Sequence, residues 1–254
     1  MRGVVRRRGS IAEYFQDDKR LFFNASMEPE LPYDPFSKSM AWSKAQNVRP
    51  NCILCGTGFD FDIGSSAIFR PVSQLTDRPV KITAIVHYWG RSRNTNGQSI
   101  VIWCTNVSAF QATMSADGSL NVLVRVSGAA RIVTNGPVVP LQQPVILAMT
   151  YDGTNIVFYT SLGERSVKPS PVSGDIDYTG VTQFWPFIGG IGTVSNATGI
   201  IGDSALFSVA LTQEEIESYF SWCRNRDLSS GRQAAQMVDG DWIGRFYRMT
   251  RMRR

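Results

Sequence analysis

Few residues of this chain could do chemistry, and their spacing matches no hydrolytic pattern. His87 is the only histidine, and no serine or cysteine stands at motif spacing from it. A nucleophilic hydrolase needs a base beside its serine or cysteine, often on a G-x-S-x-G turn, which this sequence lacks. The glycine-rich run at 189–192 leads into turn-like sequence, not into the helix of a phosphate-binding loop. We expect no hydrolysis or phosphoryl transfer and interpret His87 as part of a partly buried strand.

The four cysteines, Cys52, Cys55, Cys104 and Cys223, are the next candidates for chemistry. Cys52 and Cys55 have the spacing of half a zinc site, but no second pair of ligands follows. A chain of 254 residues can bury a core without disulfides. Reduced core thiols are therefore a better interpretation than a structural metal, and we expect no metal or cofactor.

Basic residues gather at the two ends of the chain, whose formal net charge is +5. Removing nine terminal arginines from the 26 basic residues leaves 17 against 21 acidic ones, so the body is mildly acidic. Such ends contact nucleic acid, a membrane surface or an acidic protein face, or else serve only as solubilising tails. The nine candidate contact residues are Arg2, Arg6, Arg7, Arg8, Arg245, Arg248, Arg251, Arg253 and Arg254.

Targeting signals are weak. The first ten residues carry the charge of a signal peptide, but Glu13, Asp17 and Asp18 follow where its apolar region would stand. No apolar run approaches the roughly 20 residues that span a bilayer. We expect neither a signal peptide nor a membrane span.

The elements that would position these residues are mostly short strands. Between about residues 52 and 207, apolar and polar residues alternate in short runs separated by turn residues such as Asp152-Gly153. This pattern favours an antiparallel sandwich or barrel over a parallel sheet with crossover helices. The expected strands cover 80–89, 99–105, 110–115, 119–127, 144–151 and 155–161.

One helix follows the strands. Thr212 is its expected N-cap, with Glu215 three residues on as a capping box and Leu211 pairing with Ile216 as a hydrophobic staple. A stripe of apolar residues continues along the helix and should pack on the core. It consists of Ile216, Tyr219, Phe220 and Cys223.

The flanking segments have a different character. Residues 1–50 combine basic residues, a short helix predicted from Ile11 to about Phe22, and prolines at 29, 32 and 35 that force an extended path. We predict an extended N-terminal arm at 1–50, a sandwich at 51–222 and a basic tail at 223–254.

Several pieces together resemble one known family. TYDGTNIVFYTSLGE (150–164), FIGGIG (187–192) and GIIGDSALFSVALTQEEIESYF (199–220) resemble the C-terminal half of the laminin-G-like, concanavalin-type jelly roll. CGTGFDFD (55–62) and KITAIVHYW (81–89) resemble two of its earlier strands. The resemblance implies an all-β, antiparallel jelly-roll β-sandwich with a short C-terminal helix.

The family also suggests what to look for at the rim and in the concavity. In members of the family, acidic groups at one rim bind calcium. We interpret Asp117, Asp152 and Asp203 as turn residues that bond their own backbone. No calcium site is therefore identified. Relatives that cut polysaccharides carry an E-x-D-x-x-E strand, which is missing here. We expect a protein that is not an enzyme.

Two binding functions remain, with a third carried only by the arginine ends. The first is a structural or assembly protein, because a jelly roll with extended ends resembles capsid decoration, cement or tail-associated proteins of tailed-phage virions. This predicts location in the virion, neighbouring capsid or tail proteins as partners, and a homo-oligomer. Nucleic-acid binding through the arginine ends is the third possible function, after the glycan binding described next.

The second function is a lectin-like module that binds glycan. Sugar sites need aromatic rings for stacking with polar groups beside them. The candidate glycan-binding residues are Trp89, Trp103, Phe184 and Trp185.

Overall fold

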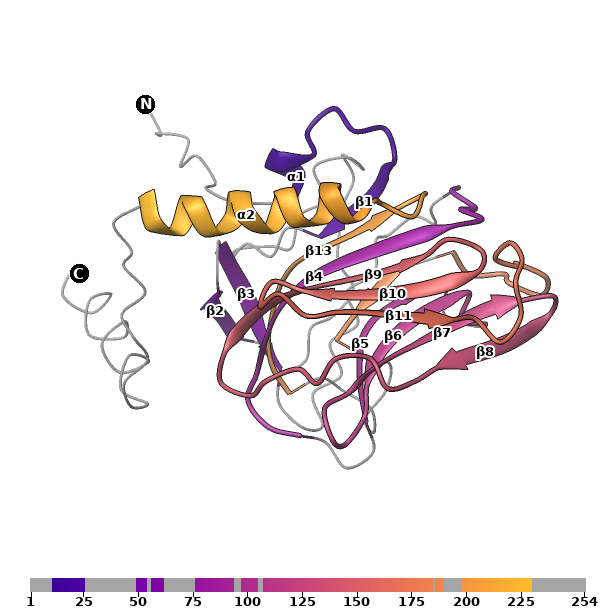
Figure 1. The fold of residues 1–254 in the computed structure, drawn as a ribbon, viewed down its shortest axis with the longest axis horizontal. Coiled ribbons are helices and arrows are strands. Elements are labelled where there is room, and N and C mark those ends of the chain that lie inside the picture. Colours follow the sequence, from indigo (N-terminus) through magenta and orange to yellow (C-terminus); the bar gives the residue numbers. More distant parts are fainter. Residues whose placement is uncertain are drawn as a thin grey trace.

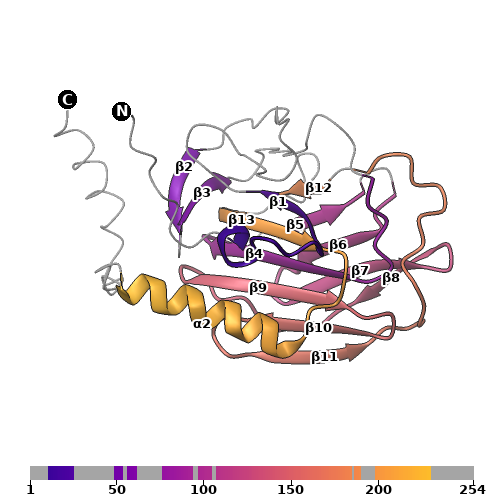
Figure 2. The same ribbon diagram turned by 90° about the horizontal axis from the view of Figure 1, so that it is seen from above.

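Two antiparallel sheets packed face to face form the body of the protein, which confirms the expected all-β sandwich (Figure 1). The computed structural model describes residues 11–25, 49–53, 56–61, 76–93, 97–104, 107–184, 186–189 and 198–229. Helix α2, Gln213–Ser229, lies along the outer side of the larger sheet, and the short helix α1, Ile11–Tyr14, lies on the same side (Figure 2).

The larger sheet has eight strands, and its central strands are the longest. Strand β1, Leu21–Ala25, pairs with β13 beside the main order. The main order is β11, Arg165–Pro169; β10, Asn155–Thr160; β9, Pro144–Tyr151; β4, Ile82–Gly90; β13, Gly199–Phe207; β3, Gly56–Phe61; and β2, Arg49–Ile53.

The smaller sheet has five strands and lies on the side of the larger sheet away from α2 (Figure 1). Its order is β12, Pro186–Ile188; β5, Gln98–Trp103; β6, Phe110–Met114; β7, Leu120–Val126; and β8, Ala129–Val133. The six strands expected from alternation between 80 and 161 correspond to β4, β5, β6, β7, β9 and β10.

Two hydrophobic cores hold the fold together. The inner core lies between the sheets and contains large side chains such as Trp103, Tyr88 and Phe158. The outer core lies between the larger sheet and the helices, and it combines Ile146 and Phe207 of the sheet with the α2 stripe. Strands β4, β9 and β13 are buried on both faces as a result.

The hairpin at 150–164 forms as its sequence predicts. Asp152 accepts hydrogen bonds through Oδ1 from the backbone N–H groups of Thr154, at 2.7 Å, and Asn155, at 2.6 Å. Gly153 has a φ of 98°, which a residue with a Cβ adopts only under strain. Tyr151 and Ile156 are then paired across the turn.

The N-terminal segment differs from the expected arm where the structure describes it. Residues 21–25 form β1 on the larger sheet, and α1 ends at Tyr14 instead of continuing to Phe22. Leu21 and Phe23 are buried in the outer and inner cores, and this burial favours a strand over a longer helix. The three prolines of the expected arm lie outside the described residues. At the other end, α2 continues past residue 222 to Ser229.

Asp203 is the clearest error among the turn predictions. It is buried in β13, where a bulge interrupts the register between Ile201 and Ser204, and its Oδ2 accepts a hydrogen bond from the Ile11 N–H at 3.3 Å. The carboxylate therefore anchors the start of α1. Asp117 and Asp152 do bond their own turns, as expected.

Candidate binding surface on helix α2

Helix α2 begins with the capping box that its sequence predicts. The Thr212 N–H donates to Glu215 Oε2 at 2.8 Å, and the Glu215 N–H donates to Thr212 Oγ1 at 3.3 Å. Leu211 and Ile216 are both buried in the outer core, as a hydrophobic staple requires. The start of the helix is thereby fixed relative to the sheet.

The apolar stripe of α2 packs against the larger sheet along its whole length. Ile216, Tyr219, Phe220 and Cys223 are all buried against it. His87 of β4 lies beneath the helix at 1% exposure, and its Nε2 is 2.7 Å from the Tyr219 hydroxyl. The histidine is thus more deeply buried than expected, and it joins α2 to the sheet through a polar contact inside an apolar interface.

Arg20 ties α2 to the N-terminal segment. Its guanidinium NH2 donates to Asp18 Oδ2 and to Glu215 Oε1, both at 2.7 Å. Hydrogen bonding from Arg20 holds the pKa of the Asp18 carboxyl below its usual range. Burial raises the pKa of Glu215, but hydrogen bonds from Thr212 and Arg20 outweigh it and the net shift is downward. Both carboxylates therefore favour the ionised form.

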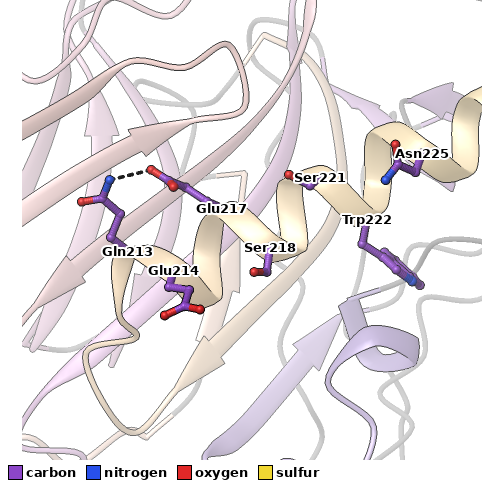
Figure 3. Close-up of a pocket in the computed structure, with 7 residues that line it drawn as sticks. All are labelled: Gln213, Glu214, Glu217, Ser218, Ser221, Trp222 and Asn225. Carbon is purple, nitrogen blue, oxygen red and sulfur yellow. Dashed lines mark hydrogen bonds between the residues drawn. The ribbon is translucent and has the colours of Figure 1, made fainter.

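The side of α2 that faces away from the sheet carries an open hollow of about 720 Å³. Two carboxylates, two hydroxyl groups, two amides and one indole line it, projecting from successive turns of the helix (Figure 3). Gln213 Nε2 donates to Glu217 Oε1 at 2.7 Å across one turn. We call the seven lining residues the α2 surface: Gln213, Glu214, Glu217, Ser218, Ser221, Trp222 and Asn225.

Trp222 gives the α2 surface a fixed aromatic group. Its ring centroid lies 5.2 Å from that of Tyr14 in α1 and 6.1 Å from that of Tyr219, onto which it stacks. The side chain is half-buried, so part of the indole reaches solvent. Rings held on both sides in this way present contact area at little cost in conformational entropy.

A smaller cleft of about 180 Å³ adjoins the α2 surface and shares Glu217 and Ser221 with it. It lies between α2 and the turn from β10 to β11, with Tyr159 and Phe220 among its lining residues. The Arg165 guanidinium lies 5.8 Å from the Tyr159 ring centroid. Polar side chains of α2 thus line both hollows.

Two of the four predicted glycan-binding aromatics meet in the structure, but in the core. Trp103 is fully buried, and its ring centroid lies 6.3 Å from that of Phe184. Its Nε1 donates to the Tyr178 hydroxyl at 3.2 Å, while the Arg78 guanidinium lies over the Phe184 ring. Trp103 points inward because it alternates with Ile102 along β5, so it offers no exposed ring for a sugar.

The other two predicted aromatics are separate from this pair. Trp89 of β4 is half-buried on the outer side of the larger sheet, opposite Pro144. Trp185 lies outside the described residues. All nine arginines at the ends of the chain also lie outside them, so their contacts stay a prediction.

The cysteines and acidic residues complete the survey. Cys104 and Cys223 are buried and form no disulfide, and burial raises the pKa of the Cys104 thiol to about 12. The side chain of Cys52 and all of Cys55 lie outside the described residues. Within the described part of the chain, no three histidine, cysteine or acidic side chains are grouped to hold a metal ion.

The amino-acid sequence predicts helix α2 and its apolar stripe but not the α2 surface. The polar side of the helix carries no motif, and only its position opposite the apolar stripe could have indicated it. Neither helix that the structure describes has the length and apolar composition of a membrane span.

Comparisons with known proteins agree on the fold. No protein-family model and no curated protein match this sequence. The binding domain of Paraclostridial Mosquitocidal Protein 1 superposes with a TM-score of 0.61 at 12% identity, over 79% of this chain and 52% of that one. The class that the structure defines is therefore a β-sandwich like that of this toxin binding domain.

Two botulinum neurotoxin structures are similar to the same degree. The binding domain of neurotoxin DC, solved in complex with rat synaptotagmin II, has a TM-score of 0.60 at 12% identity over 80% of this chain and 52% of that one. The serotype D ligand binding domain, in complex with N-acetylneuraminic acid, has a TM-score of 0.56 at 12% identity over 80% and 50%. This chain spans about half the length of these structures, and the likeness concerns the fold alone. No family match supports the laminin-G-like assignment, which stays a prediction.

Proposed function

We propose that this chain is a non-catalytic binding module that contacts neighbouring protein subunits through the α2 surface. The proposal rests on the contrast between the two sides of helix α2. Its apolar stripe is completely buried in the sandwich, while its other side is an open hollow with a half-buried tryptophan among polar groups.

The rigidity of this region supports the proposal. The capping box, the Arg20 ion pairs and the buried stripe fix the helix, and Tyr14 and Tyr219 hold Trp222. Binding sites on fixed elements lose little entropy when a partner docks, and tryptophan is enriched among energetically dominant interface residues. Solved structures with this fold include binding domains, one of them in complex with rat synaptotagmin II.

The proposed partners are further copies of this chain or other structural proteins. A homo-oligomer is one such assembly. The arginine ends would add contact area to acidic neighbours. Membership of a tailed-phage virion, as a decoration, cement or tail-associated protein, extends this proposal; it rests on the form of the sequence alone, and co-purification with capsid or tail proteins would test it.

Glycan binding is the second candidate function, and the composition of the same hollow favours it. An indole beside carboxylate, hydroxyl and amide groups is the combination that recognises sugars. A solved structure with this fold contains N-acetylneuraminic acid. Trp222 is a better stacking ring than Trp103, because Trp103 is completely buried.

The two candidates separate in one set of measurements on the full chain. For the assembly function, sedimentation velocity should show an oligomer that Ser221→Arg weakens by roughly 10-fold or more in dissociation constant, because a large charged side chain would fill the hollow. Thr113→Arg, on the smaller sheet, is the matched control and should leave the oligomer intact. A monomer that binds an oligosaccharide array, and loses that binding in Trp222→Ala, would replace assembly by the glycan function. A monomer that binds no oligosaccharide and co-purifies with no capsid or tail protein would contradict both.

A further inference from the structure

Strand β8 is an edge of the smaller sheet, and within the described residues it pairs only with β7. Arg125 of β7 lies opposite Ala130 of β8. The Arg125 N–H donates to Ala109 O, and Arg125 O accepts from the Asp177 N–H, each at 3.0 Å, so this residue bonds away from β8. Hydrogen bonding alternates along an antiparallel pair. Ala130 and Ile132 therefore direct their backbone N–H and C=O groups toward the open side of β8.

The outer face of this edge is apolar and accessible. The Ile132 side chain is 58% exposed, and Ala130 is exposed as well. Leu123 of β7 lies opposite Ile132 and is half-buried. The edge lies at the margin of the sandwich, where a further strand can approach it (Figure 1). Apolar side chains on an added strand would pack on Ile132, since cross-strand pairs of this kind stabilise a sheet.

Arg131 lies between these two residues and faces the gap between the sheets. It pairs with Val124, which is buried in the inner core, and directly opposite residues share a face of the sheet. Its Nε is buried and has no hydrogen-bond partner, and no acidic side chain of the described residues forms an ion pair with it. Lys168 of β11 opposes Ile156 of the inner core, so the edge of the larger sheet also carries an inward basic residue. An anion brought to this edge would supply the missing partner.

We propose that β8 binds an extended segment of a partner protein as an added antiparallel strand, with an acidic residue of that segment opposite Arg131. The bonds of Ala130 and Ile132 would give main-chain affinity, as in other cases of strand addition. Arg131 would then belong to a non-hydrogen-bonded pair, in which the Cα atoms are about 4.5 Å apart and the side chains lie closest. The carboxylate at that position selects the sequence of the segment. This contact is additional to the α2 surface and does not depend on it.

A second copy of this chain fits the edge less well than an acidic segment. The run SGAARIVTNG, residues 127–136, contains no acidic residue, so pairing of β8 with β8 leaves Arg131 without an anion in any register. Where Ala130 of one copy opposes Ile132 of the other, the two Arg131 side chains lie directly opposite, and like charges there are destabilising. Inward-pointing charges protect natural edge strands from such pairing. The same arginine therefore disfavours a copy and favours an acidic partner.

Two fluorescein-labelled peptides, GTVEVTG and GTVKVTG, test the charge selection by fluorescence anisotropy with the full chain at low ionic strength. They differ only in the residue that would oppose Arg131. The wild-type chain should bind the glutamate peptide at least roughly 10-fold more tightly than the lysine peptide. Arg131→Glu should reverse this preference, and Arg131→Gln should bring the two affinities close to equality. Arg224→Glu, the same charge change at an exposed arginine of α2, is the matched control and should keep the wild-type preference.

Ile132→Pro tests the backbone contact, because proline has no N–H to donate and is tolerated on edge strands. It should weaken binding of the glutamate peptide by roughly 10-fold or more, with urea denaturation as the check that the variant is folded. In the wild-type chain, peptide binding should slow hydrogen exchange of the Ala130 and Ile132 amides, and this measurement decides if the proline variant does not fold.

Three outcomes contradict the proposal. Equal binding of the two peptides to the wild-type chain would show that Arg131 does not select an acid. Binding that survives Ile132→Pro in a folded chain, or that leaves the two amides unprotected, would place the peptide elsewhere. Failure of both peptides to bind would show that β8 does not accept an added strand. The proposed function is judged separately by sedimentation of the Ser221→Arg variant, so either idea can fail while the other stands.

Discussion

The outer faces of the two sheets differ in what covers them. On the larger sheet, α2 and α1 cover the outer side, so β9 is buried on both faces along most of its length. On the smaller sheet, β6 and β7 alternate between buried and half-buried residues, because only their inner face meets the other sheet. One sheet is therefore a central layer and the other an external one (Figure 1).

The difference arises in the sequences of the strands. PVILAMTY in β9 is apolar at consecutive positions, which suits a strand covered on both faces. LNVLVRV in β7 alternates, and its outward positions are Asn121, Leu123 and Arg125. A strand with consecutive apolar residues needs a cover on both faces. For β9, the apolar stripe of α2 covers the outer face.

The outer face of the smaller sheet is open over β6 and β7 but buried at β5, and hydrogen bonds within this face satisfy some of its polar groups. Gln111 Nε2 donates to Ser99 Oγ at 3.1 Å, and Asn121 Nδ2 donates to Ser115 Oγ at 2.5 Å. Apolar side chains on this face include Leu123, paired opposite Ile132. These local bonds let the face remain in water, whereas the outer side of the larger sheet would expose its apolar side chains without α2.

The strongest test of the contrast compares two isoleucines, one on each side of the sandwich. Ile216→Ala in α2 should lower the free energy of unfolding by about 2–5 kcal/mol, because it leaves a cavity in the outer core. Ile132→Ala in β8, where the side chain is 58% exposed, should change it by no more than about 0.5 kcal/mol. Urea denaturation measures both. Similar losses would mean that both faces are covered in solution.

The polar contact under α2 sharpens the comparison at a smaller scale. Tyr219→Phe removes the hydroxyl that lies 2.7 Å from His87 Nε2 while keeping the ring. The loss of a buried hydrogen bond should lower the free energy of unfolding by about 1–3 kcal/mol. Thr113→Val, on the open face of the smaller sheet, is the control and should stay within about 0.5 kcal/mol. If Tyr219→Phe also stays within that range, the contact does not hold α2 to the sheet.

Local sequence signals predicted the parts of the fold that depend on neighbouring residues. The Asp152-Gly153 turn and the Thr212–Glu215 capping box form because their hydrogen bonds join residues two or three positions apart. Strands β8 and β11 were not predicted, since AARIV and RSVKP are short and do not alternate regularly between apolar and polar residues. Their pairing with β7 and β10 decides their conformation.

The packing of Trp222 in the α2 surface could not be predicted, because it depends on contacts between distant parts of the chain. Asp203 contacts Ile11 across 192 residues, and Trp222 is held by Tyr14 of α1. Trp103 was a reasonable stacking candidate by residue type, but the register of β5 directs it into the inner core. Residue type indicates what a side chain can do, whereas only the tertiary fold decides whether it is accessible.

The smallest predicted effect concerns the ion pairs that fasten the N-terminal segment to α2. Arg20→Gln should lower the free energy of unfolding at pH 7 by no more than about 1 kcal/mol, because the arginine side chain is 41% exposed and its pairs are partly screened. The pKa values of Asp18 and Glu215 lie below their usual range in the folded protein. Such carboxylates stabilise the folded state at pH values above their unfolded pKa of about 4. This stabilisation is lost as the pH falls through the folded pKa.

The difference between wild type and Arg20→Gln should therefore shrink toward zero as urea denaturation is repeated from pH 7 down to about pH 3. Arg131→Gln, in β8 at the edge of the smaller sheet, is the matched arginine, and its effect should not vary with pH in the same way. A constant difference for Arg20→Gln across this range would mean that Arg20 acts by packing over the sheet and not by charge. The N-terminal segment would then be held by the burial of Leu21 and Phe23 alone, as a strand of the larger sheet.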